Sequence, residues 1–421
     1  MSLSSRFLGA LLLGLLFFGQ QAVAQTRPAR SEAHWVASWA AAPQDHAQTP
    51  TWGAPASPVP PSLADQTVRL RLQPTLGGQR VRIRFSNRFG KVPLHVASAG
   101  VAISTGAASV SPATQRELRF GGHAEATIAP GREAWSDAVR LRVGPDHAVA
   151  VSYRIDAPVP FATVHHITPG ATWITSGNAV RRPDWPDAVR SSWNHIVTGL
   201  EVERSAPVRV VVAFGDSITE GAGIEDDAFV ARYPERLAQR LRGPLRNAGA
   251  FAVLNAGISG NRLLSDGVGP KGIERFRRDV LEQGGVTHVV ILIGINDIGL
   301  SMPQGSPAVP GPPSADEITA GLQQLVDQAH AAGVKVLLGT LLPFQGAVYW
   351  SEEKEQRRQA VNRWIRGRQG VDGVVDFDAA LRNPSDPMSL KPDYDGGDHL
   401  HPGKAGQAAM AGAIDLHELA E

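Results

Sequence analysis

The sequence predicts an α/β protein in two parts: an antiparallel β-sandwich over residues 35–205 and a doubly wound α/β/α parallel sheet over residues 206–421. Short segments that alternate apolar and polar residues fill the first half of the chain. In the second half, apolar strands alternate with helices. The pattern changes near residues 201–207, and we place the domain boundary there.

The composition is that of an ordinary globular protein. The chain has 421 residues, of which 43% are hydrophobic and 19% charged, so it can build a sizeable core. Its formal net charge of +1 provides no broad field to attract nucleic acid or an anionic membrane. The chain has no cysteine, which excludes disulfides, thiolate metal sites and a cysteine nucleophile.

Residues 1–24 are expected to be a cleavable signal peptide. Arg6 supplies a positive charge, residues 7–18 are apolar, and Ala22-Val23-Ala24 fits the small-x-small pattern of a cleavage site. An apolar run of about 12 residues is shorter than the roughly 20 that span a bilayer, which argues against a membrane anchor. The expected location of the mature protein is therefore periplasmic or extracellular.

The sandwich prediction rests on segments in which apolar residues alternate with arginines. In segment 68–72, Arg69 and Arg71 stand between apolar residues, so they are expected on a solvated face. The same alternation recurs at 80–85 and 139–143. Together these segments predict an antiparallel, jelly-roll-like sandwich that forms an accessory domain.

The tryptophans and a histidine pair in this half could belong to a binding site or could only pack in the core. Exposed tryptophans could stack on sugars, but burial in a core is their more common fate. Most of the tryptophans lie here: Trp35, Trp39, Trp52, Trp135, Trp173, Trp185 and Trp193. The adjacent pair His165-His166 could suggest a metal site, yet neighbours on a strand point to opposite faces, which favours ordinary polar positions.

The second half alternates strands with helices. Strands are expected at 208–214, 252–255, 288–293, 334–340 and 373–377, and helices at about 229–242, 315–332, 351–369 and 404–419. Ser314 and Glu317 have the spacing of a capping box at the start of one helix. This alternation implies a parallel sheet with helices on both faces, as in flavodoxin-like folds, and such sheets bind ligands at the carboxyl ends of their strands.

Ser217 stands at such a strand end. The apolar strand 208–214 stops at Gly215-Asp216-Ser217. A serine needs a neighbouring base to act as a nucleophile, and a serine that opens a helix is also a common N-cap. The partners of Ser217 decide between the two roles.

Two further polar motifs follow strands. Residues 255–260 end at Gly260, and glycine lets the backbone approach a ligand closely and turn an N–H toward it. Residues 294–297 end the most hydrophobic strand of the chain. Asn296 could donate a hydrogen bond to a developing oxyanion there, or it could only close a turn.

The last motif precedes the final helix. Asp398 and His401 are three residues apart, so the carboxylate can accept from one ring nitrogen while the other nitrogen faces Ser217. His399 competes for the role of base, but position 396, three residues before it, is a glycine.

These four motifs resemble those of the SGNH hydrolases, also called GDSL-type esterases and lipases, over nearly all of residues 208–419. The resemblance implies that Ser217 is the nucleophile, that His401 is the general base and then the general acid, and that Asp398 orients it. Ile218 stands where the family name has leucine, a conservative change.

The resemblance also implies an oxyanion hole. Its donors would be the backbone N–H groups of Ser217 and Gly260 and the side chain of Asn296.

Other kinds of site fit less well. The Gly-x-Ser-x-Gly pattern of α/β-hydrolases fails at Ser217, which is followed by Ile218-Thr219, and neither the glycines at 221–223 nor those at 257–260 form a phosphate-binding pattern. Asp393, Asp395 and Asp398 crowd one loop, but they lack the spacing and the later glutamate of an EF-hand loop. No cofactor, no metal and no nucleic-acid partner are expected.

The expected function is the hydrolysis of a carboxylic ester through an acyl-enzyme. An exported β-sandwich ahead of the catalytic domain is similar to carbohydrate esterases of this superfamily, including xylan esterase-like members, which favours removal of acetyl groups from an esterified glycan. The alternatives are a lipase or general short-chain carboxylesterase, and a non-catalytic glycan-binding protein. The sequence leaves open the acyl and alcohol parts of the substrate, the oligomeric state, and whether loop 301–315 walls the cleft.

Overall fold

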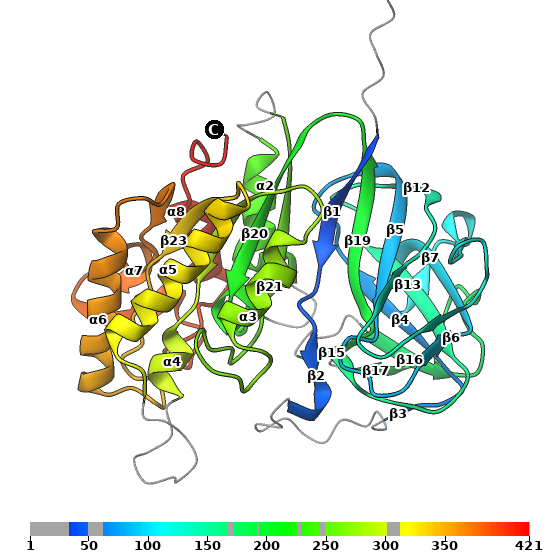
Figure 1. Cartoon of the computed structure of the whole chain (residues 1–421), viewed down its shortest axis with the longest axis horizontal. Helices are drawn as coiled ribbons and strands as arrows, with labels where there is room; N and C mark the ends of the chain where they lie inside the picture. Colours follow the sequence, from blue (N-terminus) through cyan, green and yellow to red (C-terminus); the bar gives the residue numbers. More distant parts are fainter. Residues whose placement is uncertain are drawn as a thin grey trace, which may run out of the picture. The chain divides into compact units, whose positions relative to one another are not determined.

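Five parallel strands form the sheet of the C-terminal half (Figure 1). The structure is a computed structural model, and the residues it describes are 33–48, 62–166, 172–191, 193–224, 229–243, 249–300 and 312–420. The strands lie in the order β21-β20-β22-β23-β24. Their bounds are β20 (Val208–Gly215), β21 (Ala250–Gly257), β22 (Val286–Leu292), β23 (Lys335–Gly339) and β24 (Gly373–Val375). The expected parallel α/β sheet is confirmed.

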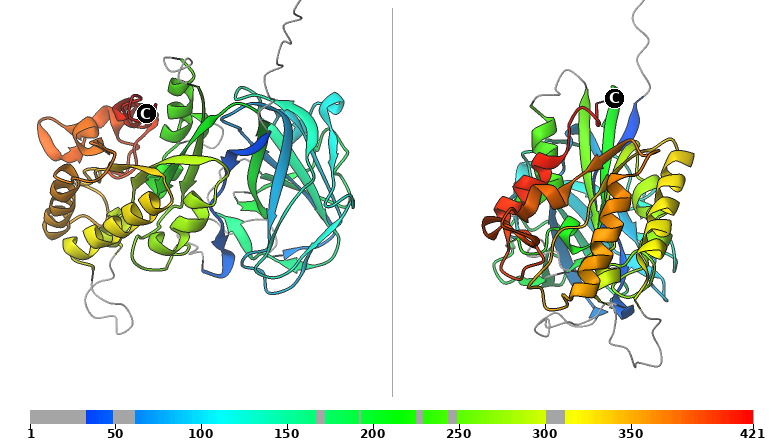
Figure 2. Two further views of the ribbon diagram at one scale, coloured as in Figure 1. Left: turned by 45° about the horizontal axis from the view of Figure 1, so that its top comes forward. Right: turned by 90° about the vertical axis from the view of Figure 1, so that its left-hand side faces the viewer.

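Helices cover both faces of this sheet. Two of the longer helices, α2 and α8, lie on one face, and α5 and α6 lie on the other (Figure 2). The four expected helices are α2 (Tyr233–Leu241), α5 (Ala315–Ala331), α6 (Glu352–Arg366) and α8 (Lys404–Ala413). Four short helices were not expected: α1 (Ser217–Glu220), α3 (Gly272–Phe276), which continues as a π-helical turn, α4 (Ile295–Gly299) and α7 (Phe377–Leu381).

Helix α5 begins at the predicted capping box. Ser314 Oγ accepts from the Glu317 N–H at 3.2 Å, and Glu317 Oε2 accepts from the Ser314 N–H at 2.8 Å. Both halves of the box are present, which confirms this prediction.

The first half of the chain is β-rich and antiparallel. One sheet has the order β1-β19-β5-β11, with β12 paired to β5, and the other has the order β17-β16-β4-β13-β7-β8, with β9 paired to β7. The first comprises β1 (His34–Ala40), β5 (Gly78–Ser86), β11 (Glu133–Trp135), β12 (Val139–Val143) and β19 (Val197–Arg204). The second comprises β4 (Gln66–Leu72), β7 (Ser98–Gly106), β8 (Ser109–Val110), β9 (Arg116–Leu118), β13 (Val149–Ile155), β16 (Thr172–Ser176) and β17 (Val189–Ser191). Apolar side chains of both sheets, such as Ile83 and Leu70, share one hydrophobic core.

Shorter strands complete this β-rich region. They are β2 (Gln44–Asp45), β3 (Ser62–Leu63), β6 (Leu94–Val96), β10 (Ala126–Ile128), β14 (Val159–Pro160), β15 (Thr163–His165) and β18 (Asn194–His195). Strand β15 pairs with β2 on one side and with β18 on the other, in a three-stranded sheet.

Arg69 on β4 corrects one expectation. The alternating pattern put it on a solvated face, but its side chain is 0% exposed. Segments carrying Ala108 and Pro183 cover this face, and the guanidinium donates to both backbone oxygens and to Ser152 Oγ. It also lies 4.0 Å from the ring centroid of Trp185. Burial lowers its pKa to about 10, so the charge persists at neutral pH.

The tryptophans of the β-rich region are packed. Trp52 lies outside the described residues, Trp185 is buried, and the other five are half-buried. The Arg82 guanidinium lies 4.8 Å from the ring centroid of Trp35 and 4.6 Å from that of Trp135. Arg82 of β5 therefore lies over both rings, in the geometry of a cation–π contact.

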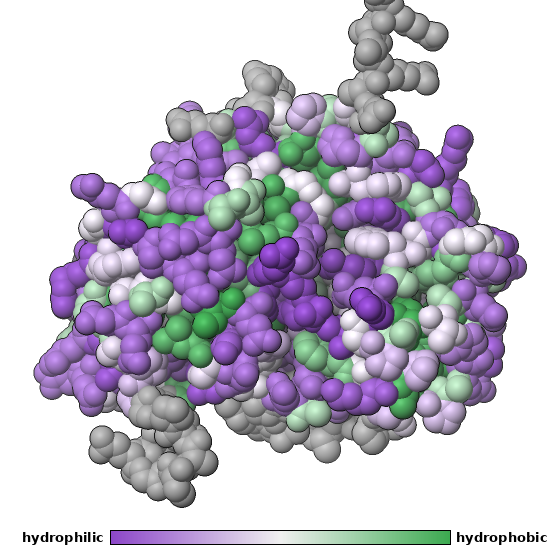
Figure 3. All heavy atoms as spheres, viewed as in Figure 1, coloured by the Kyte–Doolittle hydropathy of each residue, from purple (hydrophilic) through white to green (hydrophobic). Residues whose placement is uncertain are grey.

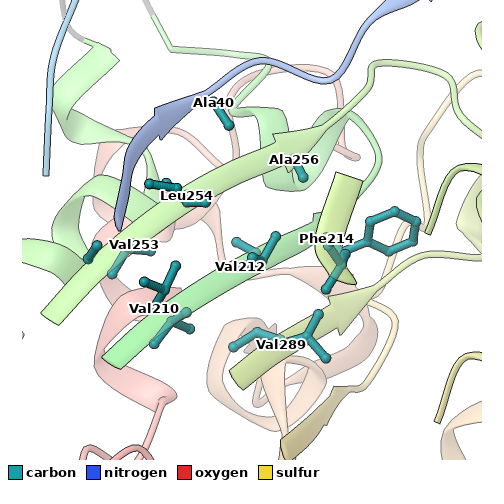
Figure 4. Close-up of a cluster of buried hydrophobic side chains, with 14 of the residues drawn as sticks. Ala40, Val210, Val212, Phe214, Val253, Leu254, Ala256 and Val289 are labelled. Carbon is teal, nitrogen blue, oxygen red and sulfur yellow. The ribbon is translucent and has the colours of Figure 1, made fainter. Parts of the chain in front are cut away.

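The β-rich and α/β regions lie within one compact unit, Ala33–Glu421. Ala40 of β1 lies beside β21 in the close-up of the core (Figure 4), and Thr75 Oγ1 lies 2.9 Å from Val253 O and 3.1 Å from Val253 N. The proposed boundary near residue 205 falls between β19 and β20, and the division into two domains stays a prediction.

The face of the molecule drawn in Figure 3 is largely hydrophilic. On the face in Figure 3, hydrophobic residues occur in small groups among polar ones. The large apolar side chains that are exposed in the described ranges are Val92, Val189, Val230 and Val348. None of the helices seen in those ranges is long and apolar enough to cross a membrane. The expected signal peptide, and residues 301–311 of the proline-rich loop, lie outside the described residues.

His195 makes stability depend on pH. Its side chain is 1% exposed, and its Nδ1 has no hydrogen-bond partner among the described residues. Burial lowers its pKa from the ordinary 6.5 to about 3, with a smaller effect of His46. Between those two values the unfolded chain binds a proton that the folded chain does not. The stabilising contribution is therefore complete above the ordinary value and is lost as the pH falls toward 3.

We expect His195→Leu to lose less stability on acidification than the wild type, because leucine has no proton to bind. Urea denaturation at about pH 7 and about pH 4.5 measures the difference in the free energy of unfolding. His123→Leu, at an exposed histidine, is the matched control and should behave as the wild type does. An equal loss in all three proteins would contradict the role given to His195.

Candidate active site

Ser217 begins α1, directly after β20. Asp216 is the N-cap of α1, because its Oδ1 accepts from the Ile218 N–H at 3.0 Å. The cap is thus Asp216, and the Ser217 hydroxyl remains available for another partner. The Ser217 residue is 5% exposed, so the hydroxyl lies in a largely desolvated position.

That partner is His401. Its Nε2 lies 2.8 Å from Ser217 Oγ, and its Nδ1 lies 2.6 Å from Asp398 Oδ2. Asp398 Oδ1 also accepts from the His401 backbone N–H at 2.8 Å. Burial would raise the pKa of Asp398, but the hydrogen bonds from His401 outweigh it and hold that pKa well below its usual range. Asp398 is therefore ionised and directs the Nδ1 proton, which leaves Nε2 free to accept from Ser217.

His399 has a carboxylate partner after all, which corrects the sequence argument against it. Its Nδ1 lies 2.6 Å from Asp395 Oδ2, and Asp395 precedes it by four residues instead of three. His399 has a φ of 63°, and its ring packs against Gly346. It thus has the carboxylate that a base requires, and what distinguishes His401 is its contact with Ser217.

The loop after β21 lies against α1. A Cβ at Gly257 would lie 2.3 Å from Glu220 N, so the close approach requires a glycine. The Ser259 N–H donates to Glu220 Oε2 at 2.5 Å, and Asn261 O accepts from Asn296 Nδ2 at 3.1 Å. Gly260 lies between these two anchored residues, with a φ of +73°.

The predicted oxyanion donors thus come from adjacent strand ends. Ser217 follows β20, Gly260 follows β21 and Asn296 follows β22, and β20 pairs with both of the other strands. The contacts of Glu220 and Asn296 connect the three segments.

Arg275 holds the same strand ends, although no sequence motif marked it. Its guanidinium donates to Gly215 O at 2.7 Å, to Ala256 O at 2.8 Å and to Asn261 Oδ1 at 2.9 Å. Asp279 is its ion-pair partner at 3.0 Å. Burial lowers the pKa of Arg275 to about 10, with Asp279 opposing the shift, so the side chain stays charged at neutral pH.

Two further carboxyl groups are buried at this edge. Burial raises the pKa of Asp216 to about 7 and that of Asp297 to about 6. Asp297 accepts from the Leu263 N–H at 2.7 Å and from the Leu264 N–H at 3.0 Å, which fixes the segment after Asn261.

The residues considered for a metal have other partners. Asp395 accepts from backbone N–H groups of its own loop, as Asp398 does. His165 and His166 are each 8% exposed and do not face one ligand: His165 Nε2 lies 2.9 Å from Glu220 Oε1, and the His166 ring packs edge-on against Trp193. Within the described ranges, no group of three or more histidines and carboxylates could hold a metal ion.

We expect Arg275→Lys to lower the free energy of unfolding by about 2–4 kcal/mol. The guanidinium reaches its three buried acceptors through three different nitrogens, and the single nitrogen of lysine cannot reach all of them. Chemical denaturation measures this loss. Arg277→Lys is the matched control, since Arg277 lies two residues away with a side chain that is 78% exposed, and it should change stability little. Equal stabilities for the two variants would contradict the role of Arg275.

Residues 213–409 match the GDSL-like Lipase/Acylhydrolase family. The matched segment runs from β20 into α8, and it contains Ser217, Gly260, Asn296, Asp398 and His401. The α/β region is thus that of an SGNH/GDSL-type serine ester hydrolase.

Solved structures give weaker likenesses. A GDSL-like lipase from Bacteroides thetaiotaomicron is 22% identical, with 50% of this chain and 87% of that chain covered and a TM-score of 0.36. The aryl esterase of M. smegmatis is 18% identical, with 49% and 95% covered and a TM-score of 0.37. Likenesses at such TM-scores carry no functional argument. Among curated proteins, no relative matches this sequence.

Proposed function

We propose that the protein hydrolyses a carboxylic ester through an acyl-enzyme on Ser217. The observation that carries the proposal is the continuous chain of contacts from Ser217 Oγ through His401 to Asp398, with distances of 2.8 and 2.6 Å. A nucleophile, a base and an orienting carboxylate in hydrogen-bond contact are the arrangement that activates a serine hydroxyl.

The proposed reaction has two halves. His401 Nε2 takes the proton of Ser217 as its oxygen attacks the ester carbonyl, and the tetrahedral oxyanion accepts from the N–H groups of Ser217 and Gly260 and from the Asn296 amide. The alcohol then leaves with the proton from His401. Water, deprotonated by His401, attacks the acyl-enzyme, and the carboxylic acid departs as Ser217 recovers its proton.

For the substrate, we propose an esterified carbohydrate, with acetyl as the acyl group. Support comes from the β-rich region that precedes the hydrolase region and from the expected export of the protein to where polysaccharides are found. A lipase that works on a lipid surface would favour a large apolar patch, whereas the exposed large apolar side chains among the described residues are four valines, at positions 92, 189, 230 and 348. A general short-chain carboxylesterase is the remaining enzymatic alternative, and a glycan-binding protein is the non-catalytic one.

The same proposal includes the finer architecture. Numbered from β20, the parallel strands have the order 2-1-3-4-5, which supports a doubly wound, flavodoxin-like sheet. The shared core of the two antiparallel sheets supports a jelly-roll-like sandwich.

We expect Ser217→Ala to lower kcat by about 10⁶-fold, because the acyl-enzyme can no longer form. Hydrolysis of p-nitrophenyl acetate measures the rate, and a fluorophosphonate probe should label the wild type but not the variant. Retention of more than about a tenth of the wild-type kcat would rule out Ser217 as the nucleophile.

Asn296→Ala should lower kcat by roughly 10²–10³-fold with little change in KM, because an oxyanion donor acts mainly in the transition state. Steady-state kinetics separate the two parameters. A rise in KM at constant kcat would instead assign Asn296 to substrate binding.

The substrate proposal predicts that acetate is released from acetylated xylan or another acetylated glycan. The Ser217→Ala variant is the control for spontaneous hydrolysis. If p-nitrophenyl acetate is cleaved and no acetylated glycan is, the protein is a general carboxylesterase. A preference for long acyl chains would identify a lipase.

A further inference from the structure

The β-rich region contacts the turn that carries Ser217. His165 lies at the end of β15, and its Nε2 is 2.9 Å from Oε1 of Glu220, the last residue of α1. Both residues are buried, with 8% and 3% of their surfaces exposed. Since α1 starts at Ser217, this contact joins the β-rich region to the helix that holds the proposed nucleophile.

Glu220 also holds the loop that carries Gly260. Its second oxygen, Oε2, accepts from the Ser259 N–H at 2.5 Å. Ser259 directly precedes Gly260, whose N–H is a proposed oxyanion donor. The orientation of the Glu220 carboxylate therefore sets the position of one peptide next to that donor.

His165 is well placed to orient this carboxylate. Glu220 Oε1 has no hydrogen-bond partner among the described residues, so the His165 contact is a close polar approach without hydrogen-bond alignment. A buried carboxylate oxygen without such a partner is costly, which makes the polar group nearest to it important for its position. Beside it lies a cavity of about 50 Å³, whose other charged walls are Arg232 and Glu235.

The other ring nitrogen of His165 is also engaged. Its Nδ1 lies 2.9 Å from the backbone oxygen of Ala42, which can only accept, so Nδ1 carries a proton. This bond fixes the direction of the ring and leaves its Nε2 facing Glu220 Oε1.

We propose that His165 is a positioning residue of the active site: by holding Glu220, it fixes the Ile258–Ser259 peptide and, through it, the adjoining peptide that carries the Gly260 N–H of the oxyanion hole. The β-rich region then completes the catalytic machinery and is more than an accessory module. This inference rests on the proposed function of the site.

The test compares His165→Asn with His165→Gln in the mature full-length protein. The asparagine amide matches Nδ1, so it keeps the bond to Ala42 but cannot reach Glu220. The glutamine amide matches Nε2 and still donates toward Glu220. We expect His165→Asn to lower kcat for p-nitrophenyl acetate by about 10- to 100-fold at unchanged KM, and His165→Gln to recover most of the loss.

Thr75→Val is the matched control. Thr75 also joins the β-rich region to the α/β region, but the hydrogen bonds of its side chain go to Ser38 and to Val253 within β21 and, among the described residues, to neither the Ser217 turn nor the Ser259 loop. Its loss should lower the melting temperature and leave kcat unchanged. A fall in kcat equal to that of His165→Asn would overturn the proposal, because any weakening of this contact between the regions would then suffice.

Other outcomes are equally decisive. An unchanged kcat in His165→Asn overturns the inference while the esterase proposal stands, whereas a wild type that hydrolyses no ester removes the esterase proposal itself. If His165→Asn does not fold, Glu220→Gln replaces it: the amide oxygen still accepts from Ser259, but the carboxylate oxygen that faces His165 is replaced by an NH₂ group. A fall in kcat of about 10-fold or more at constant KM supports the inference, and an unchanged kcat overturns it.

Discussion

The site depends on one constraint: strands that stop beneath a reactive residue leave buried backbone carbonyls that need partners. Arg275 meets that need for β20 and β21 at once, since it donates to Gly215 O and Ala256 O. A single planar, charged side chain can satisfy several acceptors in fixed directions, which an ammonium group cannot. The ends of the two strands are thereby fixed relative to each other, and with them the turn of Ser217 and the loop of Gly260.

Carboxylates do the same for the N–H groups of the loops. At four places around the site, a carboxylate accepts from a backbone N–H: Asp216 from Ile218, Glu220 from Ser259, Asp297 from Leu263, and Asp398 from His401. Charge-assisted hydrogen bonds of this kind are stronger than neutral ones. Burial raises the pKa of Asp216 and Asp297, which shows that removing these carboxylates from water is unfavourable. The hydrogen bonds that fix the loops offset part of this desolvation.

The sequence pattern predicted correctly the features that depend on residues close to one another in the chain. The strand before Ser217, the capping box at Ser314 and the pairing of Asp398 with His401 involve residues close in sequence, and all three are present. What covers a face is decided by distant segments, and there prediction failed. Arg69 was expected in solvent, yet segments far along the chain bury it.

Residues around the candidate site that sequence reasoning missed also depend on segments that are distant in the sequence. Arg275 meets its acceptors only after β20 and β21 have paired, and Glu220 meets His165 only when the β-rich region docks. The sequence gives no signal for either contact beyond a charged residue among apolar neighbours. His399 differs in that its partner Asp395 is local, but at a spacing of four residues where three had been considered.

The β-rich region contacts the α/β region at two places that would otherwise be exposed: the edge strand β21 and the buried carboxylate of Glu220. β21 is an edge strand of the parallel sheet, and an open edge presents unpaired N–H and C=O groups that invite association with other chains. Thr75 Oγ1 occupies part of that edge at Val253, while His165 places a polar ring against the buried Glu220 carboxylate. Without this surface, the hydrolase region would have an uncovered edge strand, and Glu220 Oε1 would lose the polar ring that lies against it. The β-rich region therefore covers part of the sheet edge and contacts the turn of the proposed nucleophile at the same time.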